Sequence, residues 1–306
     1  MHITHQPYND SRNDFTAMLR LVCEDAARRQ DDFIWQPGRL VDWKYGLWSD
    51  RKRFPIFFPE HAELWWSGLG DLAGFVVSEN GEGEFTVITA PGFASLLDEM
   101  LDWVVARWRS RQPGLTIEVR EADLTLQDAL LARGFASSGR VATTRRYDLA
   151  HQAGLPIHLP AGFAIVDMQT NGDWRGKRIL QVDAFQDRQA LTEADLWAYA
   201  YARTSPIYDA TLDLSIVAAD GRHAAGCEGF VDEAHGLAEV ERICTHSAFR
   251  RRGLAEAVVR SCFQRLRARG LNHAYITGLS RAANNLYEKL GPDSQSHWAG
   301  YVLEGV

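Results

Sequence analysis

The residues with the clearest chemical potential lie in a basic turn in the second half of the chain. Arg250, Gly253 and Ala255 form an R-x-x-G-x-A pattern where an extended segment gives way to a helical one. Glycine lets the backbone approach a ligand closely, and the first N–H groups of the following helix have no partner within that helix. Such groups suit a phosphate. The alternative interpretation is a solvated basic turn at a helix start.

Two carboxylates lie on the strand predicted before this turn, and a tyrosine lies on a helix after it. Glu239 and Glu241 are separated by one residue, so strand alternation places both side chains on one face. Either can take a proton from a substrate or pair with an arginine of a neighbouring strand or loop. Tyr287 is either a functional phenol or a core residue of an amphipathic helix.

Taken together, these motifs resemble the acyl-CoA-binding core of the GCN5-related N-acetyltransferases (GNAT). Besides the loop, the resemblance rests on A-E-V from Ala238, whose glutamate precedes Arg250 by eleven positions (250 − 239), and on L-Y-E-K-L-G from Leu286. It is specific over residues 238–291, architectural over 163–306 and faint over the first 149 residues.

The resemblance implies a role for each motif. Loop N–H groups would hold the CoA pyrophosphate, and the strand end would pair with the pantetheine arm and polarise the thioester carbonyl. Glu239, with Glu241 as second choice, would draw a proton from the substrate amine, and Tyr287 would protonate the leaving thiolate. The implied cofactor-binding residues are Ile243, Cys244, Thr245, Arg250, Arg251, Arg252, Gly253, Leu254, Ala255, Ser280 and Asn285.

Two positions depart from the family pattern. Ser280 stands where the family usually has asparagine, seven positions before Tyr287 (287 − 280), and Gly291-Pro292 stands where Gly-Phe is usual. The first is expected to weaken a pantetheine contact and the second to alter the approach to the last strands. For the Cys244 side chain, packing is favoured over a nucleophilic role, since no His and acid stand beside it in sequence.

Hydrophobic periodicity predicts the elements that position these residues. The arginines from Arg260 to Arg269 are assigned to a solvated helix face, and the N-terminal residues His2 and His5 to a mobile terminus. Segment 39–59 is expected to be loop with a short helix. Helices are predicted at 11–29, 93–109, 124–133, 174–185, 193–201, 254–269 and 282–290, and strands within 64–78 and at 84–90, 115–119, 140–149, 163–168, 214–233, 238–245, 273–277 and 300–304.

This order of elements occurs twice, which predicts an α/β fold with a mixed sheet, made of two tandem GNAT-like domains. Each would be a central, mostly antiparallel sheet flanked by helices. A Pro- and Gly-containing stretch from His151 marks the boundary, giving a degenerate N-terminal domain at 1–150 and an acyl-CoA-binding domain at 160–306. The first half is called degenerate because T-A-P-G-F-A-S-L-L from Thr89 replaces the basic glycine loop.

Composition limits the partners. The 306 residues carry 33 basic and 40 acidic side chains, a net charge of −7, which argues against nucleic-acid binding. Four scattered cysteines without metal spacing favour a reducing cytoplasm and no metal, and no apolar run suggests a leader or a membrane span. The protein is expected to be a monomer or homodimer. Asp183, Asp187 and Asp195 hint weakly at a cationic substrate.

The sequence therefore predicts an acetyltransferase that moves the acetyl group of acetyl-CoA, its co-substrate, to an amine of a small molecule or peptide by direct attack. Two alternatives stay open. One is a non-catalytic acyl-CoA-binding module, and the other is a transferase that uses a different acyl donor. The sequence does not identify the acceptor.

Overall fold

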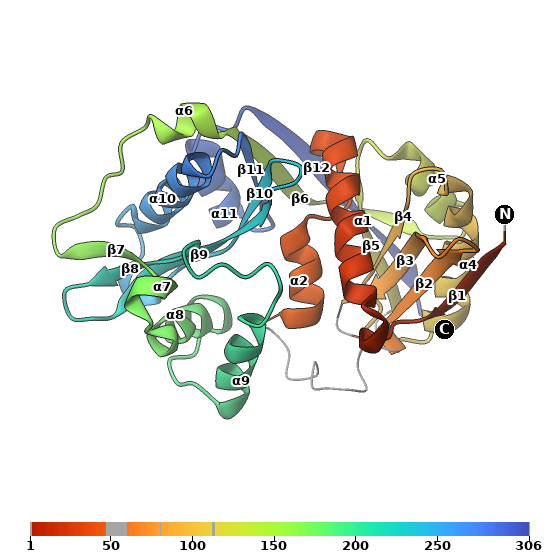
Figure 1. Cartoon of the computed structure of the whole chain (residues 1–306), viewed down its shortest axis with the longest axis horizontal. Helices are drawn as coiled ribbons and strands as arrows, with labels where there is room; N and C mark the ends of the chain where they lie inside the picture. Colours follow the sequence, from red (N-terminus) through yellow and green to blue (C-terminus); the bar gives the residue numbers. More distant parts are fainter. Residues whose placement is uncertain (1, 47–59, 80, 112–113, 306) are drawn as a thin grey trace. The chain divides into compact units, whose positions relative to one another are not determined.

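The computed structural model describes residues 2–46, 60–79, 81–111 and 114–305. They form a mixed α/β fold that divides into two compact units (Figure 1). Apart from those gaps, unit 1 contains residues 2–44, 60–143 and 296–305, and unit 2 contains 45–46 and 144–295. The last strand, β12 (Ser294–Glu304), thus lies almost wholly in unit 1. The division into sequence repeats at 1–150 and 160–306 stays a prediction.

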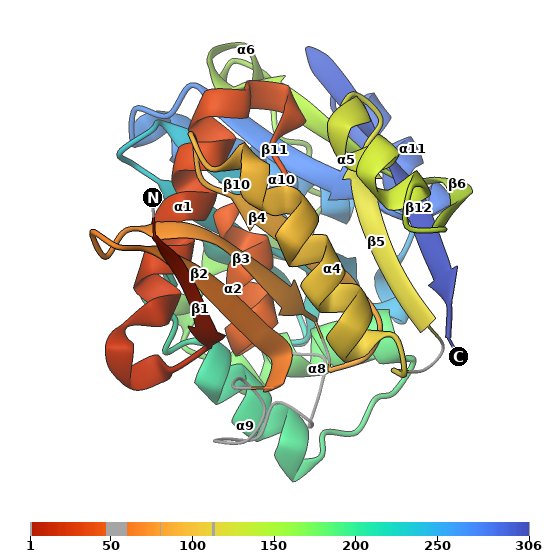
Figure 2. The ribbon, with the colours of Figure 1, turned by 90° about the vertical axis from the view of Figure 1, so that its right-hand side faces the viewer.

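Unit 1 contains an antiparallel sheet in the order β1-β2-β3-β4. Figure 2 shows α4 in front of this sheet and α1 behind it. Because both faces are covered, every residue of β3 is buried, and its sequence is nearly continuous in apolar residues. The elements are β1 (Ile3–Pro7), α1 (Asp14–Arg29), β2 (Ala62–Ser67), β3 (Leu72–Ser78), β4 (Phe85–Thr89) and α4 (Leu97–Trp108).

The expectation of a mobile N-terminus is wrong. Residues 3–7 form β1, which pairs with β2 from Ile3 opposite Ser67 to Pro7 opposite Glu63. The His5 ring lies 2.6 Å (Nδ1 to Oε1) from the Glu63 carboxylate and 5.3 Å from the Trp65 ring. Five residues are too few for a period to be recognised. The pairing partner, β2, also lies far away in the sequence, so no local hairpin pattern indicates the strand.

The rest of unit 1 surrounds a second group of strands. β5 pairs antiparallel with β12, from Gly114 opposite Glu304 to Arg120 opposite Trp298, and β12 lies beside β6. Segment 39–59 begins inside α2, and its residues 47–59 lie outside the described residues. The elements are α2 (Pro37–Tyr45), β5 (Gly114–Arg120), α5 (Leu124–Leu131) and β6 (Ala136–Asp148), and both β6 and β12 continue into unit 2.

Unit 2 contains strands in the order β6-β11-β10-β9-β8-β7. From β7 to β10 neighbouring strands are antiparallel, whereas β10 and β11 are parallel. The strands are β7 (Phe163–Asp167), β8 (Asp213–Ala218), β9 (His223–Asp232), β10 (Leu237–Thr245) and β11 (His273–Gly278), and the helices are α6 (Leu149–Ala153), α7 (Met168–Asn171), α8 (Trp174–Gln186), α9 (Glu193–Ala202), α10 (Leu254–Ala268) and α11 (Arg281–Lys289).

Two helices cover opposite faces of this sheet, as Figure 1 shows for α8 and α10. On β9, the Cys227 thiol points to the carbonyl of Val258 in α10, at 3.8 Å. The neighbouring Gly226 faces α8, because a Cβ added there would lie 2.6 Å from the Lys177 ammonium. The predicted fold class is therefore confirmed: mixed sheets, largely antiparallel, flanked by helices.

One predicted helix face differs from expectation. Arg260 of α10 is only 9 % exposed, and its guanidinium donates to Gln152 of α6 and to Glu256, both at 3.0 Å. Farther along the helix, Arg265 pairs with Asp167 at 2.7 Å. The solvated-face assignment is wrong for Arg260, because α6 forms where the sequence predicted the end of a strand and a domain boundary, and α6 packs on α10.

Candidate functional site

The site begins where β10 leaves its parallel neighbour. β10 pairs with β11 over Leu237 to Glu239, whereas its pairing with β9 continues to Thr245. A bulge lies between Glu241 and Cys244, and Arg242 within it has the left-handed φ of 53°. The paired register of β10 with β11 ends at Glu239, and the last residues of β10, Ile243 to Thr245, border a pocket.

The loop after β10 turns the chain into α10. It contains the short 3-10 helix η5 (Ser247–Phe249), then Arg251 at φ 61° and Gly253 at φ 78°. Gly253 is the N-cap of α10 and has no side chain to accept from the helix. A Cβ added to it would have no atom within 4 Å, so the glycine is required by backbone conformation and borders open space.

A pocket of about 660 Å³ joins the end of β10, this loop and α11. It brings together the sequence-predicted residues except Glu239, Glu241 and Arg252. Its volume lies in the range of small-molecule sites. The predicted residues in its lining are Ile243, Cys244, Thr245, Arg250, Arg251, Gly253, Leu254, Ala255, Ser280, Asn285 and Tyr287.

Part of the lining was missed by sequence reasoning. Ala184 and Phe185, at the C-terminal end of α8, form one wall, and Phe185 is 44 % exposed. Nothing in the spacing of these residues signals a site, because they reach it only through the packing of α8 on β9 and β10. Ala283, Leu286 and Lys289 of α11 belong to the same group.

Arg252 points elsewhere. It borders a second cavity, of about 470 Å³, together with the segment from Pro156 to Pro160. Its guanidinium carbon lies 5.6 Å from the centre of the Phe249 ring. The three consecutive arginines of the loop are therefore divided: Arg250 and Arg251 border the larger pocket, and Arg252 borders the smaller one.

Tyr287 lines the pocket, and its backbone is held by a hydrogen bond. Tyr287 is 7 % exposed, and its backbone carbonyl accepts a hydrogen bond from the Tyr147 hydroxyl at 2.8 Å. Burial, and next the carboxylate of Glu241, raise the pKa of Tyr287 above its ordinary value of 10.0. The phenol is consequently neutral at physiological pH and can act as a hydrogen-bond donor.

The two candidate glutamates occupy the face of the sheet toward α8. Glu239 is 5 % exposed and lies opposite Phe230 on β9 and Tyr275 on β11. Glu241 is half-buried and lies opposite Glu228. After burial, the charge of Glu241 is the next contributor to the raised pKa of Tyr287.

The thiol of Cys244 has the properties of a packed side chain. It is buried, and burial raises its pKa to about 12. A thiol with that pKa is protonated at physiological pH, whereas the thiolate is the nucleophile. Cys244 therefore contributes to the pocket a small, unreactive side chain and the backbone groups at the end of β10.

The two departures from the family motif have local structural roles. The Ser280 hydroxyl accepts from the N–H of Ala283 at 3.2 Å and so caps α11. Gly291, after the end of α11, has φ 73°, which a glycine adopts without the cost of a side chain. The chain can therefore reverse from α11 toward β12 before Pro292.

Two of the three aspartates that hinted at a cationic substrate are already engaged. Asp183 accepts from Ser247, and Asp195 pairs with Arg178 and Arg188, each at 3.0 Å. Asp187 is exposed at the C-terminal end of α8. Among the residues that the structure describes, no group of three His, Cys, Asp or Glu side chains forms a metal site.

Comparison with known families gives one clear match. Residues 178–291 match the acetyltransferase (GNAT) family, a range that contains β8 to β11 and every residue of the larger pocket. This segment, which lies within unit 2, is therefore similar to GNAT proteins. No curated protein matches its sequence, and no described helix is long and apolar enough to cross a membrane.

Solved structures show that the whole chain shares a fold with GNAT proteins, one of them a tandem GNAT protein. A tandem GNAT protein from the clavulanic acid biosynthesis pathway aligns with a TM-score of 0.65 and 16 % identity, covering 99 % of this chain and 98 % of that one. An acetyltransferase of Colwellia psychrerythraea aligns with a TM-score of 0.60 and 12 % identity, covering 99 % of this chain and 100 % of that one. A GCN5-related N-acetyltransferase of Sphaerobacter thermophilus aligns with a TM-score of 0.59 and 18 % identity, covering 99 % of this chain and 97 % of that one. The fold is thus the tandem two-domain type.

Proposed function

We propose that unit 2 of this protein is an acetyl-CoA-dependent N-acetyltransferase that acts on an amine of a small molecule or peptide. One observation carries the proposal. The end of β10, the first turn of α10 and the Tyr287 phenol border a single pocket of about 660 Å³. These are the three parts that acyl transfer from a phosphate-bearing thioester needs.

The residues present fit an acyl-CoA. The N–H groups at the start of α10 are not satisfied within the helix and lie beside Arg250 and Arg251, so the diphosphate finds dipoles and positive charge together. The edge of β10 from Ile243 to Thr245 offers backbone donors and acceptors to the amide groups of the pantetheine arm. When bound, the ligand supplies an acyl group activated as a thioester.

The chain's own groups then act on the reaction. An N–H group at the end of β10 donates to the thioester oxygen as negative charge develops there. A carboxylate on β10 takes one proton from the substrate ammonium, which frees the amine to attack the carbonyl carbon. The C–N bond forms, the C–S bond breaks, the nitrogen loses a second proton, and the sulfur gains one, so one proton is released overall.

Tyr287 stabilises the departing sulfur chiefly by donating a hydrogen bond. An ordinary thiol has a pKa of about 8.5, and the pKa of buried Tyr287 is raised above 10.0. Complete transfer of the phenol proton to a thiolate is therefore uphill. The proton that reaches sulfur passes through Tyr287 only if the tyrosine regains one from the ammonium or from water.

Between the two glutamates, accessibility favours Glu241 as the base. Glu241 is half-buried, so its carboxylate is the more accessible of the two to a substrate. Glu239 is 5 % exposed and packs opposite Phe230 and Tyr275. This reverses the order of preference that the family motif implies.

The test is release of CoA from acetyl-CoA, measured by thiol titration against a panel of amines. We expect Tyr287→Phe to lower kcat by about a hundredfold or more, in the usual range for loss of acid–base assistance. Glu241→Gln is expected to lower it more than Glu239→Gln. Tyr301→Phe is the matched control, because that hydroxyl bonds Gln127 in unit 1 and should leave turnover unchanged.

Three outcomes contradict parts of the proposal. Acetyl-CoA binding without turnover on any amine would indicate a non-catalytic acyl-CoA-binding module. Faster turnover with a longer acyl-CoA would indicate another donor. If the protein neither binds acetyl-CoA nor releases CoA, the proposed function is wrong.

A further inference from the structure

We propose that Asp183, on α8, is a positioning residue that holds the loop 246–253 in the shape that binds the phosphates of an acyl-CoA. This role rests on the proposed function. Asp183 is 2 % exposed, on the side of α8 that is turned toward the sheet. It is absent from the lining of the pocket, so it can act on a ligand only through the loop.

Both oxygens of the Asp183 carboxylate are bound to the residue that opens η5. The Ser247 N–H donates to Oδ2 at 2.5 Å, and the Ser247 hydroxyl donates to Oδ1 at 2.8 Å. The His246 ring adds a third neighbour: its Nδ1 lies 3.4 Å from Oδ2 and accepts from the Ala248 N–H. Hydrogen bonds to a buried carboxylate are stronger than neutral ones, so the loop is firmly anchored at its start.

The other end of the loop needs such an anchor. Arg251 has a φ of 61°, in the left-handed region that is unfavourable for a side-chain-bearing residue, and it lies four positions after Ser247 (251 − 247). Such conformations persist where the surrounding structure holds them. When the anchor is lost, the loop populates other conformations. The apparent affinity for a ligand then falls in proportion to the fraction of molecules whose loop can still bind it.

The same helix also fixes the opposite wall and the bulge of β10. Ala184 and Phe185, directly after Asp183, line the pocket. Two residues before it, Gln181 donates to Glu228 at 3.1 Å, and Glu228 accepts from Arg242 of the bulge at 2.5 Å. α8 therefore braces two parts of the site, and Asp183 is the residue that braces the loop.

The test compares two buried aspartates of unit 2. Asp183→Ala removes the loop anchor. Asp167→Ala is the matched control, because Asp167 is 8 % exposed, caps α7 and pairs with Arg265. Two quantities are measured on the full chain: calorimetric affinity for CoA, and the rate of trypsin cleavage after the exposed arginines of the loop, mapped by mass spectrometry.

We expect Asp183→Ala to weaken CoA binding by about tenfold, the effect of losing roughly one charge-assisted hydrogen bond, and to accelerate cleavage within 250–252. Asp167→Ala should lower the melting temperature without changing either quantity. Ser247→Ala keeps the backbone bond to Asp183 and should give an intermediate effect. It also replaces Asp183→Ala if that variant does not fold.

Wild-type CoA affinity together with wild-type cleavage in Asp183→Ala would overturn the inference, and so would equal effects in Asp167→Ala. The two proposals can fail separately. If the unmutated protein does not bind CoA, the proposed function fails. The cleavage measurement then still decides whether Asp183 holds the loop.

Discussion

The two units contain the same kind of strand–loop–helix segment, but they use its backbone differently. Both loops begin with N–H groups that are bonded internally: in unit 1 Ala90 donates to Ala73 at 2.8 Å and Phe93 to Ala90 at 3.0 Å, and in unit 2 His246 donates to Ala224 at 3.0 Å and Phe249 to His246 at 2.9 Å. The difference comes after this first turn. In unit 2, Gly253 opens α10 toward a pocket. The proposed phosphate site therefore depends on the turn from Arg250 to Gly253, which follows the shared first turn in unit 2, and the shared architecture does not supply it.

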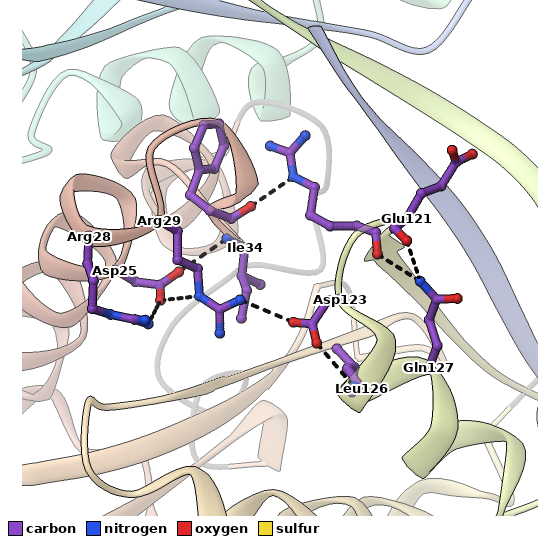
Figure 3. A network of polar contacts seen from close by, with 10 residues as sticks. Asp25, Arg28, Arg29, Ile34, Glu121, Asp123, Leu126 and Gln127 are labelled. Carbon is purple, nitrogen blue, oxygen red and sulfur yellow. Dashed lines mark hydrogen bonds and ion pairs between the residues drawn. The ribbon is translucent and has the colours of Figure 1, made fainter.

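The helices near the two loops also differ: in unit 2 they line a pocket, and in unit 1 they are joined by ion pairs. In unit 2 the end of α8 and the length of α11 line the pocket. In unit 1, Arg29 at the end of α1 binds Asp25 at 2.8 Å and Asp123, the N-cap of α5, at 3.1 Å (Figure 3). Asp25 also accepts from the N–H of Ile34. In unit 1, ion pairs between side chains of the protein itself thus join the end of α1 to the start of α5.

The largest expected difference between the units is in the unfolding free energy lost when a buried lysine is replaced. Lys177 of unit 2 binds Asp213 at 2.8 Å with both side chains at most 1 % exposed, whereas Lys44 of unit 1 binds Asp10, whose side chain is 46 % exposed. Lys177→Met should cost about 3–5 kcal/mol of unfolding free energy, because it strands a buried carboxylate. Lys44→Met should cost about 1 kcal/mol or less, because Asp10 stays hydrated.

Chemical denaturation of both variants measures this difference. Equal losses would mean that Asp213 finds compensation, with the hydroxyls of Tyr199 and Tyr208, which already donate to it at 2.8 and 3.0 Å, as the available donors. The contrast between the two units in buried charge would then disappear.

A smaller effect separates backbone strain from ligand binding. Gly253 in unit 2 and Gly92 in unit 1 both have positive φ, 78° and 85°, and a Cβ at either would have no atom within 4 Å. Alanine at each should therefore cost a similar amount, about 1–2 kcal/mol, from strain alone. Only Gly253→Ala should also weaken CoA binding, because only that position borders the pocket.

Melting temperature and calorimetric CoA affinity, measured on both glycine variants, test this. A loss of affinity in Gly92→Ala as large as in Gly253→Ala would show that the first loop also serves the ligand. Such a result would end its description as degenerate.

The smallest expected effect is a difference in pH dependence. Burial, and next the charge of Glu79, raise the pKa of Glu84 in unit 1 from 4.5 to about 7. The folded protein therefore binds more protons than the unfolded one between these values, and stability falls as pH rises from 4.5 to 7. Glu84→Gln should flatten this part of a plot of melting temperature against pH. A curve parallel to that of the unmutated protein contradicts the assignment.

Unit 2 shows the opposite sign at lower pH. Burial alone would raise the pKa of Asp195, but hydrogen bonds from Thr192 and pairing with Arg188 and Arg178 lower it from 3.8 to about 2. Its stabilising contribution is complete above pH 3.8 and is lost as pH falls toward 2. Asp195→Asn should remove that loss, and an unchanged acid limb would contradict it.

Much of the fold was predictable because long elements have periodic sequences. The pattern from Leu254 predicted α10 to within one residue of its observed end at Ala268, and Gly253 marked its start. β1 was missed, since its five residues carry no period. β12 begins at Ser294, six residues before the predicted start, because its first residues are polar and pair with a partner that is distant in sequence.

The candidate site divides along similar lines. Residues from Ile243 to Ala255 are consecutive in the chain, and Ser280 to Tyr287 share one helix and its cap, so local motifs could propose them. Arg252 is the exception within the loop, because its position depends on which way one turn of backbone points. Ala184, Phe185 and Asp183 carry no motif, and their relation to the loop exists only after α8 packs on the sheet.

The sequence by itself determined the type and order of the long elements and the glycine turn that opens α10. These depend on local backbone preference and on periodic burial, which neighbouring residues decide. Tertiary structure alone decided that the pairing of β10 with β11 ends at Glu239, that Asp183 anchors Ser247, and that Arg29 bridges α1 and α5 in the other unit. These features join residues far apart in the chain, and only packing sets such distances.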